Sequence, residues 1–428
     1  MREFPLSRRG LLKITLLGSL ASLFSKGAFA GTSPLIVTLT NKTTTSLSFS
    51  FISTTSGKVF VEYGTSKDRL VYKSAISSVI SKKIKNISID GLKPNTVIYY
   101  RVRYMLGKSK NFLALPIRNT KTHQELSSTT FAIQADPHMD QNSSEEVYLN
   151  TLKQVVAVAP AFLMDLGDIF MVDKLQDKSE ANIRGRFELM RSYYSNLENI
   201  PLKITLGNHD GELGYSKFNT KNFRKEYFPE QTGDLAYFAF DGPGQLHVVL
   251  DPFTYTVENP KDDGWQWTLG KEQYEWLGRT LAASDAQHKF IYIHHLLVGN
   301  AQSRGGVEIA HLNEWGGKSI DGSYDFDKYR QGWGKPIHQL LLDNKVGFVF
   351  KGHDHLYVKQ ELDGIIYQTL PQPSHPGEKL DLTQYGYLSG KGVGGSGFLK
   401  VRTDGSTAFV DFIKHDGSIA DSYSRIAP

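Results

Sequence analysis

The chain has 428 residues, of which 40% are hydrophobic and 22% charged, a composition that suits a globular protein of more than one domain. It contains no cysteine, which excludes disulfides, zinc–thiolate sites and a cysteine nucleophile. The formal charge is +5, but residues 1–30 carry five Lys and Arg against one Glu. The remainder is therefore near +1, and this overall balance gives no electrostatic case for a nucleic-acid or membrane-surface binder.

Residues 1–30 have the pattern of a secretory signal peptide. Arg8 and Arg9 precede an apolar stretch, Ile14 to Phe24, and the small-x-small site Ala28-Phe29-Ala30. The paired arginines resemble a twin-arginine signal, so the predicted location is the periplasm or the exterior of a bacterium. A membrane anchor is the alternative, but the apolar run is too short to span a bilayer comfortably. No later stretch of ~18 apolar residues follows, so we expect no membrane span after signal removal.

Residues 31–124 are predicted to form an all-β sandwich. Short segments rich in Thr, Ser, Val, Ile and Tyr read as strands at residues 35–39, 46–50, 59–63 and 98–103, without intervening helices. This pattern is typical of immunoglobulin and fibronectin type III architectures. The turn at residues 91–96 resembles the one before a late strand of fibronectin type III domains. No cluster of metal-ligating residues occurs here, so we expect a docking or shielding module without chemistry.

Residues 125–428 change to buried apolar runs that alternate with amphipathic helices, as in α/β folds. Six such runs cover residues 131–135, 161–166, 204–206, 246–250, 290–293 and 346–350. A helix is expected over residues 145–158, with Ser143 and Glu146 spaced like a capping box. Further helices are expected near residues 184–197 and 273–283, and strands at residues 365–368 and 398–412. His247 lies inside the fourth run, which favours a structural role.

Five of the six runs end in polar clusters. The clusters contain Asp136 and His138; Asp168; Asn208, His209 and Asp210; His294 and His295; and His353 and His355. Open α/β sheets place ligands at the carboxyl ends of their strands, so these side chains should converge there. Spacing of two in an extended segment would put Asp136 and His138 on one side, and His353 and His355 likewise. Adjacent His294 and His295 should point to opposite sides, so one of them is expected to be a ligand.

The other histidines fit the cluster pattern less well. His123, His288, His338 and His415 are expected near element ends or on exposed faces, without a site role. A long insertion, Gly299 to Gly334, follows the His294 cluster and could border a substrate pocket. Whether His295, His311 or His375 touches substrate stays open, and Asp140 and Asp173 are expected to be solvated loop carboxylates.

The ordered set of motifs resembles the calcineurin-like metallophosphoesterase family over about residues 127–415. With the β-sandwich in front, the chain resembles the purple acid phosphatases. The resemblance implies a four-layer α/β/β/α sandwich that holds two metal ions and hydrolyses phosphate esters by attack of a metal-bound hydroxide. It implies one ion held by Asp136, His138, Asp168 and His355, and the other by Asp168, Asn208, His294 and His353. His209 would contact the phosphoryl oxygens or protonate the leaving group, oriented by Asp210.

Two positions depart from the purple acid phosphatase pattern. His138 stands where those enzymes have glycine, and Met171 stands where they have the tyrosine that colours an Fe(III) centre. A purple Fe(III) centre is therefore not expected. Two divalent ions with oxygen and nitrogen ligands are expected instead, with Mn, Fe and Zn left open.

The favoured function is an exported phosphomonoesterase acting on a small-molecule or oligomeric phosphate ester. A phosphodiesterase on the same site is the first alternative, because both activities use this set of motifs. A non-catalytic exported module that binds a ligand through the β-sandwich is the second alternative. In such a module some of the metal-ligating residues should be replaced, whereas no ligand position is missing in this sequence. No specific nucleic-acid binding is expected.

Overall fold

The computed structural model describes residues 34–122, 128–172, 174–210, 221–228, 235–256, 264–298, 303–377 and 380–428. The predicted leader lies outside these residues, and so does the predicted domain boundary at residues 124–125. Within the described ranges, no helix is both long and apolar enough to cross a membrane.

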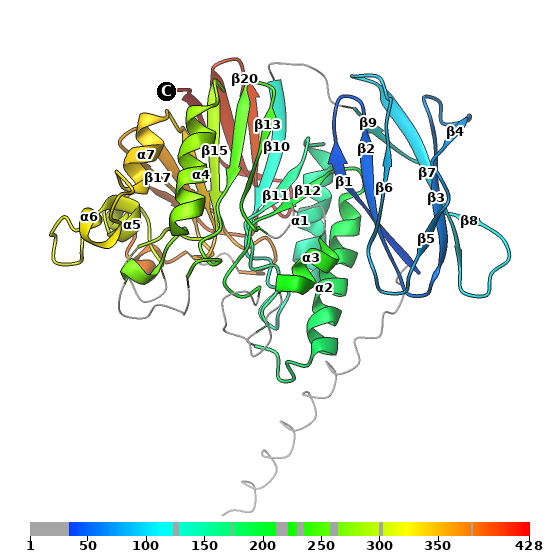
Figure 1. The fold of residues 1–428 in the computed structure, drawn as a ribbon, viewed down its shortest axis with the longest axis horizontal. Helices are drawn as coiled ribbons and strands as arrows, with labels where there is room; N and C mark the ends of the chain where they lie inside the picture. The colour runs from blue at the N-terminus through cyan, green and yellow to red at the C-terminus, as the bar shows by residue number, and fades with distance from the viewer. Residues whose placement is uncertain are drawn as a thin grey trace, which may run out of the picture.

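The N-terminal part is a sandwich of two β-sheets, drawn in blue and cyan in Figure 1. One sheet has the order β1-β2-β6, and the other contains β4-β3-β7-β8 with β5 and β9 paired to it. The strands are β1 Leu35–Lys42, β2 Leu47–Ser53, β3 Gly57–Gly64, β4 Tyr72–Lys73, β5 Ser77–Val79, β6 Lys85–Ile89, β7 Val97–Leu106, β8 Leu113–Ala114 and β9 Arg118–Lys121. Alternate residues such as Phe49, Val61 and Val102 fill the core between the sheets, as expected for half-buried strands.

The C-terminal part contains two larger mixed sheets. The first has the order β12-β11-β10-β20-β21-β22, in which β10, β11 and β12 are parallel. Its strands are β10 Ser128–Gln134, β11 Leu163–Asp165, β12 Leu202–Ile204, β20 Gly397–Asp404, β21 Thr407–Lys414 and β22 Ile419–Ile426. The second has the order β13-β14-β15-β16-β18-β17-β19. Its strands are β13 Phe238–Gly242, β14 Gln245–Val249, β15 His288–Ile293, β16 Phe348–Lys351, β17 Tyr357–Leu362, β18 Ile365–Thr369 and β19 Lys391–Val393.

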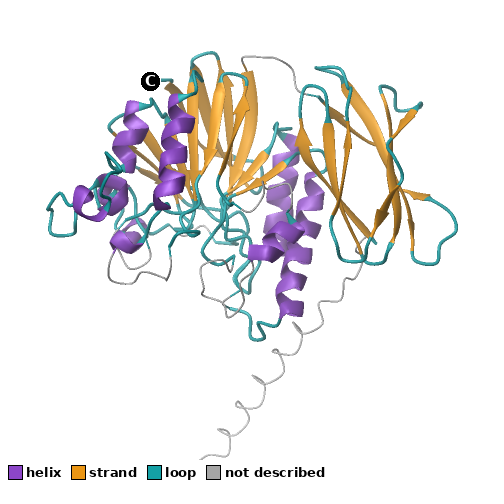
Figure 2. Ribbon diagram, in the orientation of Figure 1, coloured by secondary structure: helices purple, strands orange, loops and turns teal. Residues whose placement is uncertain are grey.

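Helices cover the outer faces of these sheets, which gives four layers (Figures 1 and 2). The helices are α1 Glu145–Ala157, α2 Glu180–Tyr194, α3 Lys221–Tyr227, α4 Gly270–Ala282, α5 Asn313–Gly316, α6 Phe326–Tyr329 and α7 Ile337–Asp343. Helices α1 and α2 pack on the first sheet, and α4, α5 and α7 pack on the second. Phe131, Phe290, Phe350 and Phe412 belong to the core between the sheets. The structure therefore confirms the expected four-layer α/β/β/α arrangement of this part.

His247 of β14 lies in this inter-sheet core and has the structural surroundings that were predicted. Its ring packs against Phe131, Phe162 and Phe290. The two ring nitrogens lie 2.9 Å from the Tyr292 hydroxyl and 2.8 Å from Gln245 Oε1. Burial lowers the pKa of His247 to about 3, so the ring is neutral.

The predicted capping box at the start of α1 is wrong by one residue. Ser144 is the N-cap, and its hydroxyl oxygen accepts from the Val147 N–H at 3.3 Å. Ser143 instead donates its hydroxyl to the Pro137 carbonyl at 3.3 Å. This contact ties the start of α1 to the loop that follows β10.

A buried arginine joins the β-sandwich to the C-terminal part. Arg191 of α2 is 1% exposed and donates to the Tyr227 carbonyl oxygen at 2.6 Å. It also donates to the hydroxyl oxygens of Thr38 (3.3 Å) and Ser50 (2.9 Å), on β1 and β2. One charged group thus satisfies acceptors from both parts, which fixes the sandwich against α2.

We predict that Arg191→Ala lowers the free energy of unfolding by about 3 kcal/mol, because the substitution leaves buried acceptors without a donor and creates a cavity. Denaturant unfolding of the purified protein measures this change. Arg279→Ala is the matched control, because Arg279 has a side chain that is 70% exposed on α4. Equal unfolding midpoints for the two variants would contradict the structural role of Arg191.

Candidate metal centre

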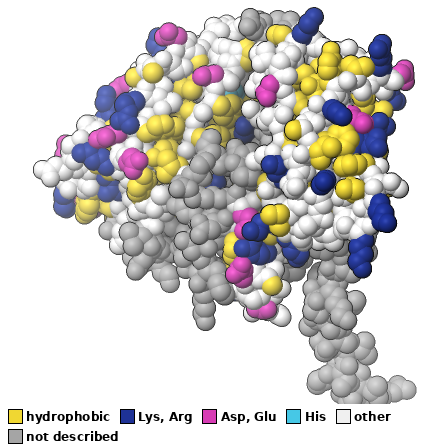
Figure 3. Space-filling model, turned by 45° about the vertical axis from the view of Figure 1, so that its right-hand side comes forward, with side chains coloured by type: hydrophobic (Ala, Val, Ile, Leu, Met, Phe, Trp, Pro, Cys, Tyr) yellow, Lys and Arg dark blue, Asp and Glu magenta, His cyan; other side chains and the backbone are white. Residues whose placement is uncertain are grey.

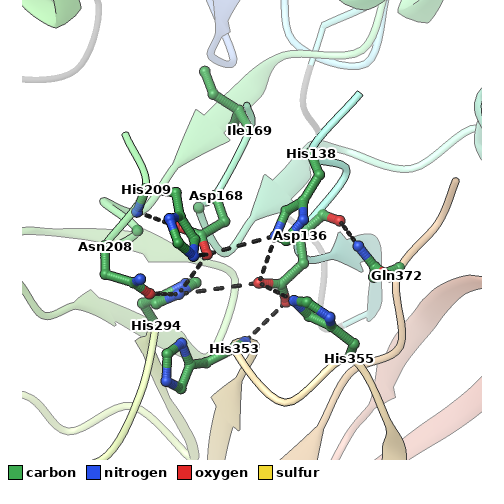
Figure 4. A network of polar contacts seen from close by, with 12 residues as sticks. Asp136, His138, Asp168, Ile169, Asn208, His209, His294, His353, His355 and Gln372 are labelled. Atoms are coloured by element: carbon green, nitrogen blue, oxygen red, sulfur yellow. Dashed lines mark hydrogen bonds and ion pairs between the residues drawn. The ribbon is translucent and has the colours of Figure 1, made fainter. Parts of the chain in front are cut away.

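Two groups of metal-ligating side chains lie where the parallel strands of both sheets end. Asp136, His138 and His355 form one group, and Asp168, His294 and His353 form the other. In each group, one ligand atom per residue lies within 4.8 Å of the others. Figure 4 shows the rings and carboxylates pointing toward a common centre.

Asp168 lies between the two groups. Its Oδ2 atom is 3.6 Å from His138 Nε2 and 3.3 Å from His294 Nε2. Asn208 joins the second group, because its Oδ1 lies 2.9 Å from His294 Nε2. The structure thus brings together all seven predicted ligands, with a carboxylate that can reach both groups.

The backbone achieves this convergence by a route that the sequence did not predict. β10 ends at Gln134, and Asp136 and His138 have φ values of 58° and 50° in the left-handed region. His353 and His355 also have positive φ values, 70° and 59°. The expectation of extended segments is therefore wrong, and each ligand is turned inward by a local reversal of the chain. Such conformations are unfavourable for non-glycine residues and are concentrated at functional sites.

Two glycines let these loops approach one another. A Cβ on Gly207 would lie 2.1 Å from the backbone nitrogen of Asp168, and one on Gly352 would lie 2.5 Å from Asp136 Oδ2. No side chain can be accommodated at such distances, so both positions require glycine. The Gly-Asn-His-Asp and Gly-His-Asp-His motifs therefore begin with glycine for a steric reason.

The hydrogen bonds of the ligands suit a bound cation. His294 Nδ1 lies 2.8 Å from the Leu166 carbonyl oxygen, which fixes Nδ1 as the donor and directs the Nε2 lone pair to the centre. Asp136 accepts the His353 N–H at Oδ2 (2.9 Å), while its buried Oδ1 has no hydrogen-bond partner. The buried Nε2 of His138 is likewise without a hydrogen-bond partner. Unsatisfied oxygen and nitrogen donors directed at one point fit divalent metals.

Burial and charge set the protonation of the group. Burial lowers the pKa of His138, His353 and His355, so these rings are neutral and offer lone pairs. Burial raises the pKa of Asp136 to about 8, against the opposing effect of His294. Burial also disfavours the charged form of His294, but Asp168 and Asp136 raise its pKa to about 9. The carboxylates therefore favour positive charge at the site, which the proton on His294 supplies. A bound cation would supply that charge in place of the proton.

Asp210 holds the loop that carries Asp168. Its carboxylate oxygens accept the backbone N–H groups of Gly207 (2.8 Å), Asp168 (3.0 Å) and Ile169 (2.9 Å). Asp210 is 4% exposed. These contacts give it a positioning role toward Asp168, whereas the predicted orientation of His209 by Asp210 stays a prediction.

Sequence reasoning missed Asp354, which lies between the ligands His353 and His355. Asp354 Oδ2 accepts from Lys351 Nζ (2.7 Å), the Tyr387 hydroxyl (2.6 Å) and the Gly305 N–H (3.0 Å). Arg304 donates to the His353 carbonyl at 2.6 Å. The insertion is thereby fastened to the ligand loop. The only sequence signal was an acidic residue between two ligand histidines.

The remaining candidates lie in different surroundings. His295 is fully buried and packs 4.5 Å from the Trp267 ring, outside both groups. His311 and His375 are exposed and lie in neither ligand group. His288 Nε2 lies 2.9 Å from the Gly405 carbonyl oxygen, and His338 Nδ1 lies 2.7 Å from the Tyr367 hydroxyl, so both rings make contacts away from the ligand groups. Asp140 pairs with Lys174 at 3.0 Å. His123, Asp173 and residues 299–302 of the insertion lie outside the described residues, whereas residues 303–334 include η3 Val307–Ile309, α5 and α6.

We predict that Gly352→Ala removes metal from the protein, because the new Cβ would displace Asp136. Elemental analysis of the purified variant measures this loss. Gly185→Ala is the control, because a Cβ at Gly185 meets nothing within 4 Å and alanine favours the helix. Full metal content in the Gly352 variant would show that the loop can relax without losing its ligands.

A second prediction separates two roles for Asp210. If Asp210 positions the Asp168 loop, Asp210→Ala should lower both metal content and activity, because three backbone N–H groups lose their acceptor. If it only orients His209, activity should fall while metal content stays unchanged. Elemental analysis and an activity assay on one sample distinguish the two outcomes, and we expect the first.

Comparison with known proteins agrees with this geometry. The family model described as calcineurin-like phosphoesterase matches residues 129–357, more than half of the chain. Purple acid phosphatase 15 of Arabidopsis thaliana is 21% identical over 226 residues, which cover 47% of this chain and 39% of that protein. The aligned region thus spans well under half the length of that curated relative.

Two solved structures share the fold over almost the whole chain. The structure of PhoD superposes with a TM-score of 0.69 at 14% identity, covering 93% of this chain and 91% of that one. The purple acid phosphatase PPD1 from yellow lupin (Lupinus luteus) superposes with a TM-score of 0.64 at 16% identity, covering 92% and 74%. With the family match over its catalytic motifs, the chain belongs to the calcineurin-like phosphoesterase family.

Proposed function

We propose that this chain is an exported phosphomonoesterase that works with two divalent metal ions. The observation that carries the proposal is the pair of ligand groups, which Asp168 Oδ2 connects, with His209 beside Asp168. The similarity to purple acid phosphatase 15 of Arabidopsis thaliana supports the preference for monoesters. The proposed arrangement is a leader at residues 1–30, a fibronectin III-like domain at 31–124 and a catalytic domain at 125–428.

In this proposal Asp136, His138, Asp168 and His355 hold one ion, and Asp168, Asn208, His294 and His353 hold the other. When bound, two such ions supply Lewis acidity and a water of lowered pKa for attack on phosphorus. The protein contributes a fixed, buried set of ligands whose Nδ1 or backbone contacts set their orientation. Met171 is buried beside this region and offers no phenolate, so the proposed ions are divalent Mn, Fe or Zn.

His209 is proposed to act on the substrate. Its side chain is 18% exposed, more than that of Asp168, and its Nε2 lies 4.0 Å from Asp168 Oδ2. Its backbone N–H donates to Asp168 Oδ1 at 2.7 Å, which fixes the residue beside the proposed bridging ligand. An imidazole in this position can donate a hydrogen bond to a phosphoryl oxygen or a proton to the departing alcohol.

We predict that His209→Ala lowers turnover of an aryl phosphate by about 10²-fold or more while both metals stay bound. Asp168→Asn should lose metal, because a bridging carboxylate becomes a neutral amide. Arg279→Ala is the control, since the Arg279 side chain is 70% exposed on α4 and lies in neither ligand group. Steady-state kinetics and elemental analysis check both variants. Full activity in the His209 variant would overturn its assigned role.

A substrate panel tests the preference between ester classes. An aryl phosphate and a bis-aryl phosphate share the leaving group, so their kcat/KM ratio reports the preference directly. The proposal expects a higher kcat/KM for the monoester. A higher value for the diester would replace the proposed function with a phosphodiesterase that uses the same site.

A further inference from the structure

The near-neutral charge of residues 31–428 hides a strong division along the chain. Residues 34–122 contain 15 Lys and Arg but only 3 Asp and Glu, a net charge of +12. Residues 123–428 contain 29 Lys and Arg against 40 Asp and Glu, a net charge of −11. Figure 3 shows Lys and Arg outnumbering Asp and Glu over the right-hand half of the molecule. Charge asymmetry of this size is typical of proteins whose basic part meets an anionic partner.

Part of this positive charge lies where three loops of the sandwich meet. These loops, residues 54–56, 80–84 and 107–112, form what we call the basic end. The Gly107 N–H donates to the Ser56 carbonyl oxygen at 2.9 Å, and the Ser81 N–H donates to the Ser56 hydroxyl oxygen at 3.0 Å. The Lys82 N–H donates to the Ser53 carbonyl at 2.8 Å. The loops are therefore tied to one another and present a defined surface.

Five exposed lysines surround the basic end, namely Lys58, Lys82, Lys83, Lys108 and Lys110. The three loops contain no acidic residue. Among the residues that the structure describes, the one ion pair of these lysines joins Lys82 to Glu188 at 3.5 Å. Apolar side chains are exposed beside them, with Ile80 58% and Leu113 54% accessible. The surface therefore combines a net positive charge with exposed apolar groups.

We propose that the basic end docks on an anionic phospholipid bilayer. Lysines are attracted to anionic headgroups, and apolar side chains between them can enter the headgroup boundary. A soluble polyanion would use the charge but would give no reason for exposing Ile80 and Leu113. The chain also enters the structure at this end, because the Pro34 carbonyl accepts the Thr54 N–H at 3.1 Å.

Docking at this end would turn the metal centre toward the same bilayer. Lys82 pairs with Glu188 of α2, and Arg186 of the same helix donates to the His138 carbonyl at 3.4 Å. In Figure 1 the ends of β11 and β12 that lead into the ligand loops and the basic end of the sandwich lie on the same lower side. The docking itself does not rest on the proposed function. Its consequence, access of the metal centre to phosphate esters at a membrane surface, does rest on the proposed function.

Sedimentation with vesicles tests the proposal. The full chain and a chain starting at residue 31 are mixed with vesicles of neutral phosphatidylcholine, alone or with a third of anionic phosphatidylglycerol. The chain starting at residue 31 should sediment with the anionic vesicles and stay in solution with the neutral ones. The variant Lys83→Glu, Lys108→Glu, Lys110→Glu should reduce anionic-vesicle binding at least tenfold. The matched control is Lys67→Glu, Lys93→Glu, Lys121→Glu, which makes the same charge change on exposed lysines at the opposite end of the sandwich.

The outcomes separate the alternatives. Retained binding in the control variant, with loss in the basic-end variant, supports the proposal. Equal loss in both variants would show diffuse attraction and overturn it, as would absence of binding to anionic vesicles. Binding of inorganic polyphosphate without binding of vesicles would assign the surface to a soluble polymer instead. Turnover of a soluble aryl phosphate should be unchanged in both variants, so a failure of the proposed function registers separately from a failure of docking.

Discussion

The structure depends on one buried carboxylate that needs compensating positive charge. Asp168 is 1% exposed, and burial alone would raise its pKa. His294 and His209 nevertheless hold that pKa well below its usual range. A buried charge is tolerated only where partners offset the loss of hydration. The loops, helices and sheets around Asp168 keep these partners, His294 and His209, in place.

Backbone strain is the second constraint, and it follows from the first. Five of the seven proposed ligands, Asp136, His138, Asp168, His353 and His355, have positive φ values. Each such conformation costs on the order of 1 kcal/mol for a residue with a side chain. Packed strands immediately before each loop and the hydrogen bonds that Asp210 and Asp354 accept hold these backbone conformations in place. Without these contacts, the loops would relax and the ligands would separate.

The sequence predicted the strands that lead into the ligand loops and helices α1, α2 and α4, because buried apolar runs and amphipathic segments have a clear pattern. Strands such as β6 and β17 and helix α7 were not predicted. The family resemblance then supplied the ligand set, and the structure placed all seven residues at one edge. The backbone geometry of the ligand loops was harder to predict from the sequence. A spacing of two suggested extended segments at Asp136 and His138, whereas the chain reverses there, because periodicity describes strands and not the loops after them.

Contacts made across the fold also escaped prediction. Asp354 accepts from the Gly305 N–H and Arg304 donates to the His353 carbonyl, and each of these contacts joins residues 49 positions apart. Arg191 likewise contacts the sandwich through Thr38 and Ser50. The division of charge was present in the sequence but was concealed by summing over the whole chain. It became meaningful once the loops of the basic end were seen to lie together.

Anomalous X-ray diffraction from crystals of the purified protein tests the central claim most directly. The account predicts two metal peaks ~3.5–4 Å apart, with the Asp168 carboxylate between them. Two peaks without a shared Asp168, a single peak, or no peak at saturating metal would contradict it.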